Sequence, residues 1–404
     1  MIARRRMFSP LCLLLSMALA SGALGCGQGK PPRKSRHHAE EPAATITPAQ
    51  DAGSDTSKHH HKDKDETDAA SSGDSKKDGD GKSDKRTHDH TAKPGDIWWL
   101  ITMHGEDGKP QGVWGVTGQG ELKGPVNQPM ADGPGGPAPH SMRGLTPLPS
   151  GGFLAVNAFS KDTRILQFGP KDSNGQYPFV GNFTVLGPSN PAMVHAYQMA
   201  IGADGSVYVS NQDSNTVTRY AGIGKPNAGQ PISLPVAANA PADLQPGVVV
   251  PNSKSSPEGL GEVRGIAFGP DGLLYACDRS GSRVSGYDTT TGRRVKVLAD
   301  ASHGLKHPIQ VLFTQDGQTA YIGDNGTDSI FRVRISDGTV DTLVKKGDAG
   351  LKAPSGLAIK GNWLYVGSRE GKQILRFKLA DGKADEKPVA TLPDNPEFLM
   401  WVGD

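Results

Sequence analysis

Three residues with metal-ligating side chains open three successive copies of an internal repeat. His195, Glu262 and His307 each precede an apolar run, and each is followed at the same offset by an Asp-Gly pair. Imidazole nitrogens and carboxylate oxygens are ligands of divalent cations such as zinc, and the same groups move protons in catalysis. If the fold brings the three together, they form a candidate metal or catalytic site. If it does not, they are polar residues that line a channel.

A second set of polar residues occupies related positions of the repeat. Arg143 and Arg264 come two residues after the residue that opens their unit, whereas the others stand at the end of a second apolar run. Asp and Asn at such a position also cap the following turn through their own side chains, which is their alternative role. The candidate lining residues are His104, Arg143, Asn157, Asn211, Arg264, Asp278 and Asp324.

The elements that must position these residues are short β-strands. Residues 262–278 read as an apolar strand, an Asp-Gly turn and a second strand that ends in Asp. Asp-Gly between apolar runs is a strong hairpin signal because both residues tolerate positive φ. Comparable units begin at His195 and His307 and, more weakly, near Ser141 and Ala353. With a third and a fourth strand after each hairpin, the unit predicts one blade of a β-propeller.

The two chain ends supply the strands of one further blade. Residues 395–404 match a first strand and stop at its turn, while residues 97–103, 112–117 and 121–126 provide three more strands. Pairing them would close the ring and remove the exposed sheet edges. We therefore predict an all-β fold in which residues 96–404 form one six-bladed β-propeller.

Strand polarity places the candidate residues on one face of that propeller. The residues that open first strands, the residues that close second strands and the links between blades all meet at one rim, whereas the Asp-Gly turns lie on the opposite face. We call this rim and the channel opening that it surrounds the mouth. The long links, residues 127–139, 185–191 and 235–261, also belong to it.

The N-terminal residues predict export and anchoring. Arg4, Arg5 and Arg6 precede an apolar stretch over residues 11–24, which is shorter than the roughly 20 residues that a membrane span needs. Residues 23–26, Ala-Leu-Gly-Cys, resemble a bacterial lipobox, although the usual leucine is replaced by Ala23. The resemblance implies a lipoprotein signal peptide over residues 1–25, lipidation of Cys26, and attachment to the cell envelope outside the cytoplasm, at the outer membrane or cell surface. An ordinary secretory signal is the alternative.

Residues 26–95 predict a disordered polar tether after the lipidated cysteine. Ile46 is the only large apolar residue between residues 27 and 95, so the segment cannot bury enough surface to offset the entropy of ordering. The run His59, His60 and His61 could bind a transition metal, but without fixed geometry such binding is weak and unselective. A solvated spacer is the alternative.

Composition and motifs exclude several functions. The chain has 404 residues and a formal net charge of +2, and no basic patch alternates with aromatic residues, so we expect no nucleic-acid partner. Cys277 is the only cysteine after Cys26, which leaves no disulfide within the folded part, and we interpret it as a buried apolar residue. No nucleophile elbow and no phosphate-binding glycine loop stands out.

The repeat resembles that of NHL-type six-bladed propellers, through its Asp-Gly turn and its second strand of the form Tyr-Val/Ala/Ile-x-Asp/Asn. Propellers host enzymes, binders and scaffolds alike. We expect a membrane-anchored binding or interaction module that takes an unknown protein, glycan or small molecule at the mouth, with a divalent metal cation as the one candidate cofactor. The alternative is a divalent-metal-dependent lyase or lactonase-like hydrolase, because the mouth also resembles those of virginiamycin B lyase and lactonase-type propellers. That resemblance implies His195 and His307 as ligand or base and Glu262 as ligand.

Overall fold

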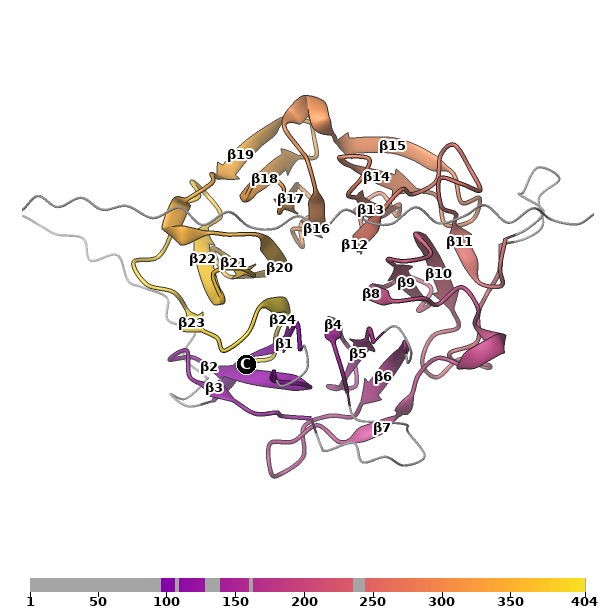
Figure 1. Ribbon diagram of the computed structural model, residues 1–404, viewed down its shortest axis with the longest axis horizontal. Coiled ribbons are helices and arrows are strands. Elements are labelled where there is room, and N and C mark those ends of the chain that lie inside the picture. The colour runs from indigo at the N-terminus through magenta and orange to yellow at the C-terminus, as the bar shows by residue number, and fades with distance from the viewer. Residues whose placement is uncertain (1–95, 106–108, 128–138, 160–162, 235–243, 404) are drawn as a thin grey trace, which may run out of the picture. The chain divides into compact units, whose positions relative to one another are not determined.

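Six four-stranded antiparallel sheets form a ring around a central axis (Figure 1). The computed structural model describes residues 96–105, 109–127, 139–159, 163–234 and 244–403. The predictions for the signal peptide, for Cys26 and for the tether with His59, His60 and His61 lie outside these residues. Within them, no helix is long and apolar enough to cross a membrane.

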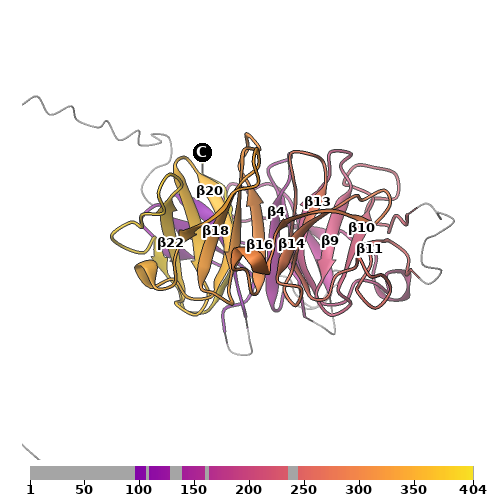
Figure 2. The same ribbon diagram turned by 90° about the horizontal axis from the view of Figure 1, so that it is seen from above.

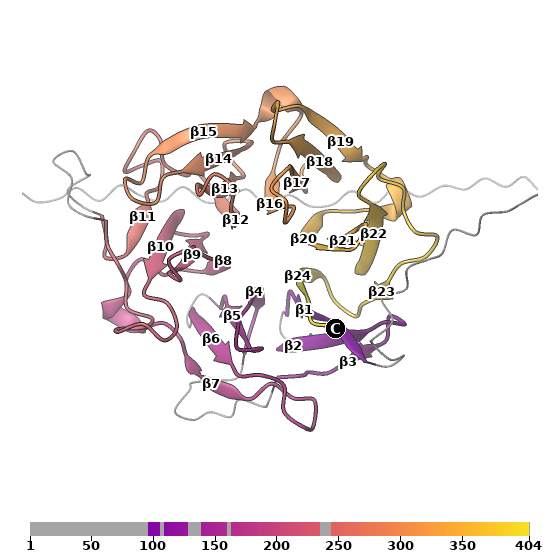
Figure 3. The same cartoon turned by 180° about the vertical axis from the view of Figure 1, so that it is seen from behind.

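The predicted six-bladed β-propeller is confirmed, and each sheet is one blade. Seen from the side, the strands run between the two faces of the ring (Figure 2). In every blade the first strand lies nearest the axis, as the view from behind also shows (Figure 3). We name the blade that joins the chain ends the closing blade and the others after their innermost strands. The closing blade holds β24 (Pro396–Trp401), β1 (Ile97–Met103), β2 (Val113–Thr117) and β3 (Leu122–Lys123).

The remaining five blades follow one another around the ring. The β4 blade holds β4 (Met142–Pro147), β5 (Phe153–Asn157), β6 (Arg164–Phe168) and β7 (Phe179–Asn182). The β8 blade holds β8 (Ala196–Ile201), β9 (Val207–Asn211), β10 (Thr216–Tyr220) and β11 (Val248–Val250). The β12 blade holds β12 (Val263–Phe268), β13 (Leu274–Asp278), β14 (Arg283–Tyr287) and β15 (Arg294–Ala299). The β16 blade holds β16 (Pro308–Phe313), β17 (Thr319–Asp324), β18 (Ser329–Arg334) and β19 (Val340–Val344). The β20 blade holds β20 (Pro354–Lys360), β21 (Trp363–Ser368), β22 (Gln373–Lys378) and β23 (Ala390–Thr391).

The two chain ends pair directly, as the sequence predicted. In the ladder between β1 and β24, Leu100 stands opposite Met400, and Thr102 stands opposite Phe398. The register then shifts by one residue, so that Glu397 falls in a bulge before Met103 pairs with Pro396. The C-terminal strand is therefore the innermost strand of a blade that otherwise comes from the start of the described chain.

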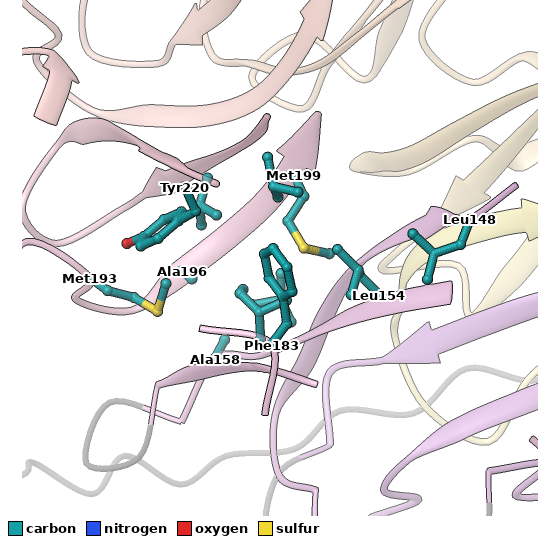
Figure 4. Close-up of a cluster of buried hydrophobic side chains, with 12 residues drawn as sticks. Leu148, Leu154, Ala158, Phe183, Met193, Ala196, Met199 and Tyr220 are labelled. Carbon is teal, nitrogen blue, oxygen red and sulfur yellow. The ribbon is translucent and has the colours of Figure 1, made fainter. Parts of the chain in front are cut away.

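The core is divided into one apolar cluster at each blade interface. Between the β4 and β8 blades, Leu154 and Ala158 pack with Ala196, Met199 and Tyr220 (Figure 4). Five comparable clusters fill the other interfaces. Cys277 belongs to one of them and is fully buried, as predicted, and burial raises the pKa of its thiol well above the ordinary value. Stability is thus distributed around the ring, because each blade needs both neighbours to bury its faces.

Glycine alternates with larger residues on the innermost strands. Equivalent positions hold glycine in β4, β12 and β20 but a larger residue in the other three first strands. A side chain added at Gly265 would place its Cβ 2.6 Å from the carbonyl oxygen of Ile309 and 2.8 Å from the Cα of Gln310, distances that real Cβ atoms do not show. The absence of a side chain therefore lets neighbouring first strands approach closely at the axis. The alternating residues are Gly144, Gln198, Gly265, Gln310, Gly356 and Phe398.

We expect Gly265→Ala to destabilise the protein by about 1–3 kcal/mol, because the added methyl group forces two first strands apart. Gly323→Ala in β17 is the matched control, since its added Cβ meets nothing closer than 3.5 Å. Its effect should be near zero or slightly stabilising. Urea unfolding of both variants measures the difference, and equal effects would show that the close approach at Gly265 does not constrain the ring.

Candidate functional site

One backbone hydrogen bond repeats in all six blades and defines the mouth. The residue after the second strand donates its N–H to the carbonyl of the residue that opens the first strand. His104 occupies this position in the closing blade, so it follows the second strand rather than closing it. The donor–acceptor pairs are His104–Asn395, Ala158–Ser141, Gln212–His195, Arg279–Glu262, Asn325–His307 and Arg369–Ala353.

Four of the predicted lining residues close second strands, and all four are fully buried. The Asp278 carboxylate accepts hydrogen bonds from the backbone N–H groups of Gly261, Glu262 and Gly281, and Asp324 binds the adjoining turns in the same way. Asn157 accepts from the backbone N–H of His140. Asn211 donates to backbone carbonyls and to Thr218. These side chains therefore have the alternative, capping role, and the surface of the mouth is formed by their neighbours.

The bulges of the first strands place a second column of residues around the axis. Tyr197, Ile309 and Phe398 form one apolar cluster, and the rings of Tyr197 and Phe398 are 5.3 Å apart in an edge-to-face arrangement. Their strands belong to alternate blades, so this contact spans the axis. The column that occupies the bulges is Arg143, Tyr197, Arg264, Ile309, Ser355 and Glu397.

Glu397 is the centre of an ionic network that joins the chain ends. One of its oxygens, Oε1, lies 2.9 Å from Nδ1 of His104 and 2.9 Å from Nε of Arg369. Arg143 donates to the carbonyl oxygens of His104 and Met142, and its Nη2 lies 3.0 Å from Nδ1 of His104. Burial alone would raise the pKa of Glu397, but Arg143, His104 and Arg369 together lower it to about 2. Glu397 is therefore an ionised carboxylate at neutral pH.

A second ionic group lies on the β12 blade. Nη2 of Arg264 lies 2.7 Å from Oε1 of Glu262, and Nη1 of Arg279 lies 2.9 Å from the same oxygen. Burial lowers the pKa of Arg264 even though Tyr197 and Glu262 act in the opposite direction. Glu262 is thus occupied by two guanidinium groups.

Both ring nitrogens of His195 are also occupied. Its Nδ1 lies 3.1 Å from a carboxylate oxygen of Asp213, and its Nε2 contacts the side-chain amide of Gln212. Burial lowers the pKa of His195, and Arg143 and Arg264 add to this effect while Asp213 opposes it. The residue also has a left-handed backbone conformation, with φ of 51°, which is costly for a non-glycine residue.

The structure does not bring His195, Glu262 and His307 together as a metal-binding group. Across the part of the chain that the structure describes, no group of three or more His, Cys, Asp or Glu side chains could hold a metal ion. His195 and Glu262 have the partners given above, and His307 is exposed at the rim. The mouth is instead dominated by guanidinium groups.

Sequence reasoning found only part of this cluster. His104, Arg143, Glu262 and Arg264 were predicted from their positions in the repeat, whereas four others were missed. A signal was present, because Tyr197 and Glu397 share the repeat position of Arg143 and Arg264, while Arg279 and Arg369 share the position of His104. A comparison of these two repeat positions across all six units would have identified the four residues. The missed residues are Tyr197, Arg279, Arg369 and Glu397.

A cavity of about 300 Å³ opens beside the mouth, next to the outer strands of the β8 blade. It is lined by the turn after β9 and by the chain on both sides of β11, including Asp213, Asn215, Gln245 and Asn252. Asp213 joins this cavity to the His195 side of the mouth.

The chain matches no protein-family model and no curated protein. Among solved structures it is similar to a chain of a nidogen/laminin complex, with a TM-score of 0.53 and 13% identity over 76% of this chain and 98% of that chain. It is also similar to a putative 6-phosphogluconolactonase from Bacteroides uniformis, with a TM-score of 0.46 and 14% identity over 72% and 81% of the two chains. Virginiamycin B lyase from Staphylococcus aureus gives 0.40 and 17% over 64% and 73%. Likeness at such identities shows the fold alone.

Proposed function

We propose that the chain is a lipid-anchored, extracytoplasmic propeller of the NHL type that acts as a binding module and takes its ligand at the mouth. Cys26 would carry the lipid, and residues 27–95 would give the propeller reach from the bacterial outer membrane or cell surface. The ligand would be a protein, a glycan or a small molecule. The position of the lipobox-like residues before a long polar stretch supports the anchoring part of the proposal.

Charged side chains are held differently on the two faces of the propeller, and this difference supports the mouth as the binding face. At the mouth, charged side chains are held by partners from distant parts of the chain, and Glu397 and Arg143 are buried. Burying charge is costly, so such an arrangement needs many compensating contacts. On the opposite face, ion pairs such as that of Arg334 with Asp337 are local and exposed, as on an ordinary protein surface.

Site-specific photocrosslinking in intact cells tests the choice of face. A photoreactive residue at His307 or at Glu370, both exposed at the mouth, should give a discrete adduct with the ligand. The matched control is the same residue at Asp337, which is exposed on the opposite face. Adducts from Asp337 alone, or equal adducts from both faces, would contradict the proposal.

Metabolic labelling with radioactive palmitate tests the anchor. The wild-type chain and Cys12→Ser should incorporate label, whereas Cys26→Ser should not and should be released from the membrane fraction. Label retained in Cys26→Ser would contradict lipidation at that residue. This result is independent of the crosslinking experiment, so either part of the proposal can fail alone.

A further inference from the structure

At the axis of the mouth, guanidinium groups outnumber the carboxylates that pair directly with them. Four guanidinium groups lie there. Glu262 contacts two of them, and Glu397 contacts Arg369 and the ring of His104. The carboxylate of Asp213 pairs with Nδ1 of His195 instead. The four are Arg143, Arg264, Arg279 and Arg369.

One polar group at the centre of this charge has no partner. The hydroxyl of Tyr197 makes no hydrogen bond with any described residue, and its oxygen is not among the fully buried polar atoms that lack a partner, so it meets the solvent of the mouth. Its ring is fixed by Phe398 on one side, while the guanidinium of Arg264 lies 5.9 Å from the ring centre. The hydroxyl is therefore a rigid donor.

The pKa shifts of Arg264 and His195 show how burial and neighbouring charges act on these two side chains. Burial lowers the pKa of Arg264 in spite of Glu262, which means that its charge is desolvated more than its carboxylate partner compensates. Burial is the main cause that lowers the pKa of His195, and the charges of Arg143 and Arg264 lower it further. Burial raises the pKa of Tyr197, and Glu397 adds to this effect, whereas Arg264, Arg143 and Arg369 act in the opposite direction.

We propose that the space in front of the Tyr197 hydroxyl binds an oxyanion of the ligand, a carboxylate or phosphate group, with this hydroxyl as one donor and the guanidinium groups of Arg143, Arg264 and Arg369 as the charge partners. The inference rests on the proposed function and names the chemistry of the ligand group that the mouth takes. Guanidinium groups suit both anions because their planar donors match carboxylate and phosphate oxygens. The rigid ring of Tyr197 and the ion-paired arginines are ordered before binding, which reduces the entropic cost.

Calorimetric titration of the full chain with inorganic phosphate and, separately, with acetate tests this inference, at constant ionic strength kept with chloride. We expect one site per chain. Tyr197→Phe, which removes only the hydroxyl, should weaken binding about tenfold or more, because a hydrogen bond to a charged group is lost. Arg264→Gln should weaken it at least as much. Arg334→Gln, an exposed arginine of the opposite face, should bind like the wild type.

The outcomes separate this inference from the proposed function. Binding of phosphate alone, acetate alone or both supports the inference and tells whether the ligand group is a phosphate, a carboxylate or either. Binding of neither anion, or equal affinity in Tyr197→Phe, Arg264→Gln and the wild type, overturns it. Mouth-specific crosslinks without anion binding would overturn the inference and leave the proposed function standing.

Discussion

Replacing Glu397 with glutamine lowers the free energy of unfolding at neutral pH by about 3 kcal/mol, because it leaves guanidinium groups at the mouth without their buried counter-charge. The Glu397 side chain is 4% exposed and contacts both His104 and Arg369. Glutamine keeps the shape of the side chain, so the loss comes from charge rather than from a cavity. Urea unfolding monitored by circular dichroism measures it.

The same carboxylate makes stability depend on pH in the acid range. The pKa of Glu397 is about 2 in the folded protein, against 4.5 for an unperturbed glutamate. A group whose pKa is lower in the folded state adds stability above its unfolded-state pKa, and this stability is lost as the pH falls through the folded-state value. The wild type should therefore lose on the order of 3 kcal/mol from this group between about pH 5 and pH 2. The gap between wild type and Glu397→Gln should narrow over that range.

Asp337→Asn is the control for these measurements. The pKa of Asp337 is also about 2, through hydrogen bonds from Thr339 and Arg334, but its side chain is exposed to solvent on the opposite face. Exposed pairs contribute little to stability, so this substitution should have a small effect. Equal losses in the two variants, or a gap that stays constant with pH, would contradict the role given to Glu397.

Removal of residues 395–404 is expected to prevent folding altogether. The deletion takes away β24, and with it the buried side chains of Phe398, Leu399 and Met400. Each large apolar side chain removed from a core costs about 2–5 kcal/mol, and a domain has only about 5–15 kcal/mol of net stability. The closing blade would also lose its innermost strand and expose the edge of β1.

Removal of residues 403–404 is the matched control, because the ladder between β1 and β24 ends at the pair of Trp99 and Trp401. This variant should unfold cooperatively, with a stability close to that of the wild type. The longer deletion should give a chain without the near-ultraviolet signal of ordered aromatic side chains. A folded, cooperative protein without residues 395–404 would show that the C-terminal strand does not close the ring.

Much of the fold could be predicted because its signals are local and repeated. The Asp-Gly turn, as at Asp271 and Gly272, fixes a hairpin within a few residues, and repetition turns one hairpin into a blade count. The leftover first strand at the C-terminus then had only one place to pair. The capping role of Asp278 was also readable, because a side chain that ends a strand acts on the turn beside it.

The composition of the site was harder to predict because it depends on contacts between distant residues. His104 and Glu397 are 293 residues apart, and nothing near Glu397 in the sequence marks it as the partner of His104 and Arg369. The residue types at His195, Glu262 and His307 do not reveal which neighbours they pair with, and Glu262 contacts Arg264 and Arg279. The sequence contains the alternating glycines Gly144, Gly265 and Gly356. Only the short distances between neighbouring first strands show why a side chain cannot be added there.

A double-mutant cycle between His104→Ala and Glu397→Gln tests most directly whether closure of the ring assembles the mouth. The two side chains come from opposite ends of the propeller sequence and meet only if β24 pairs with β1. We predict a coupling energy of about 0.5–3 kcal/mol in urea unfolding, as for residues in one ionic network. Strict additivity of the two substitutions would contradict the account, because it would mean that the chain ends do not meet at the mouth.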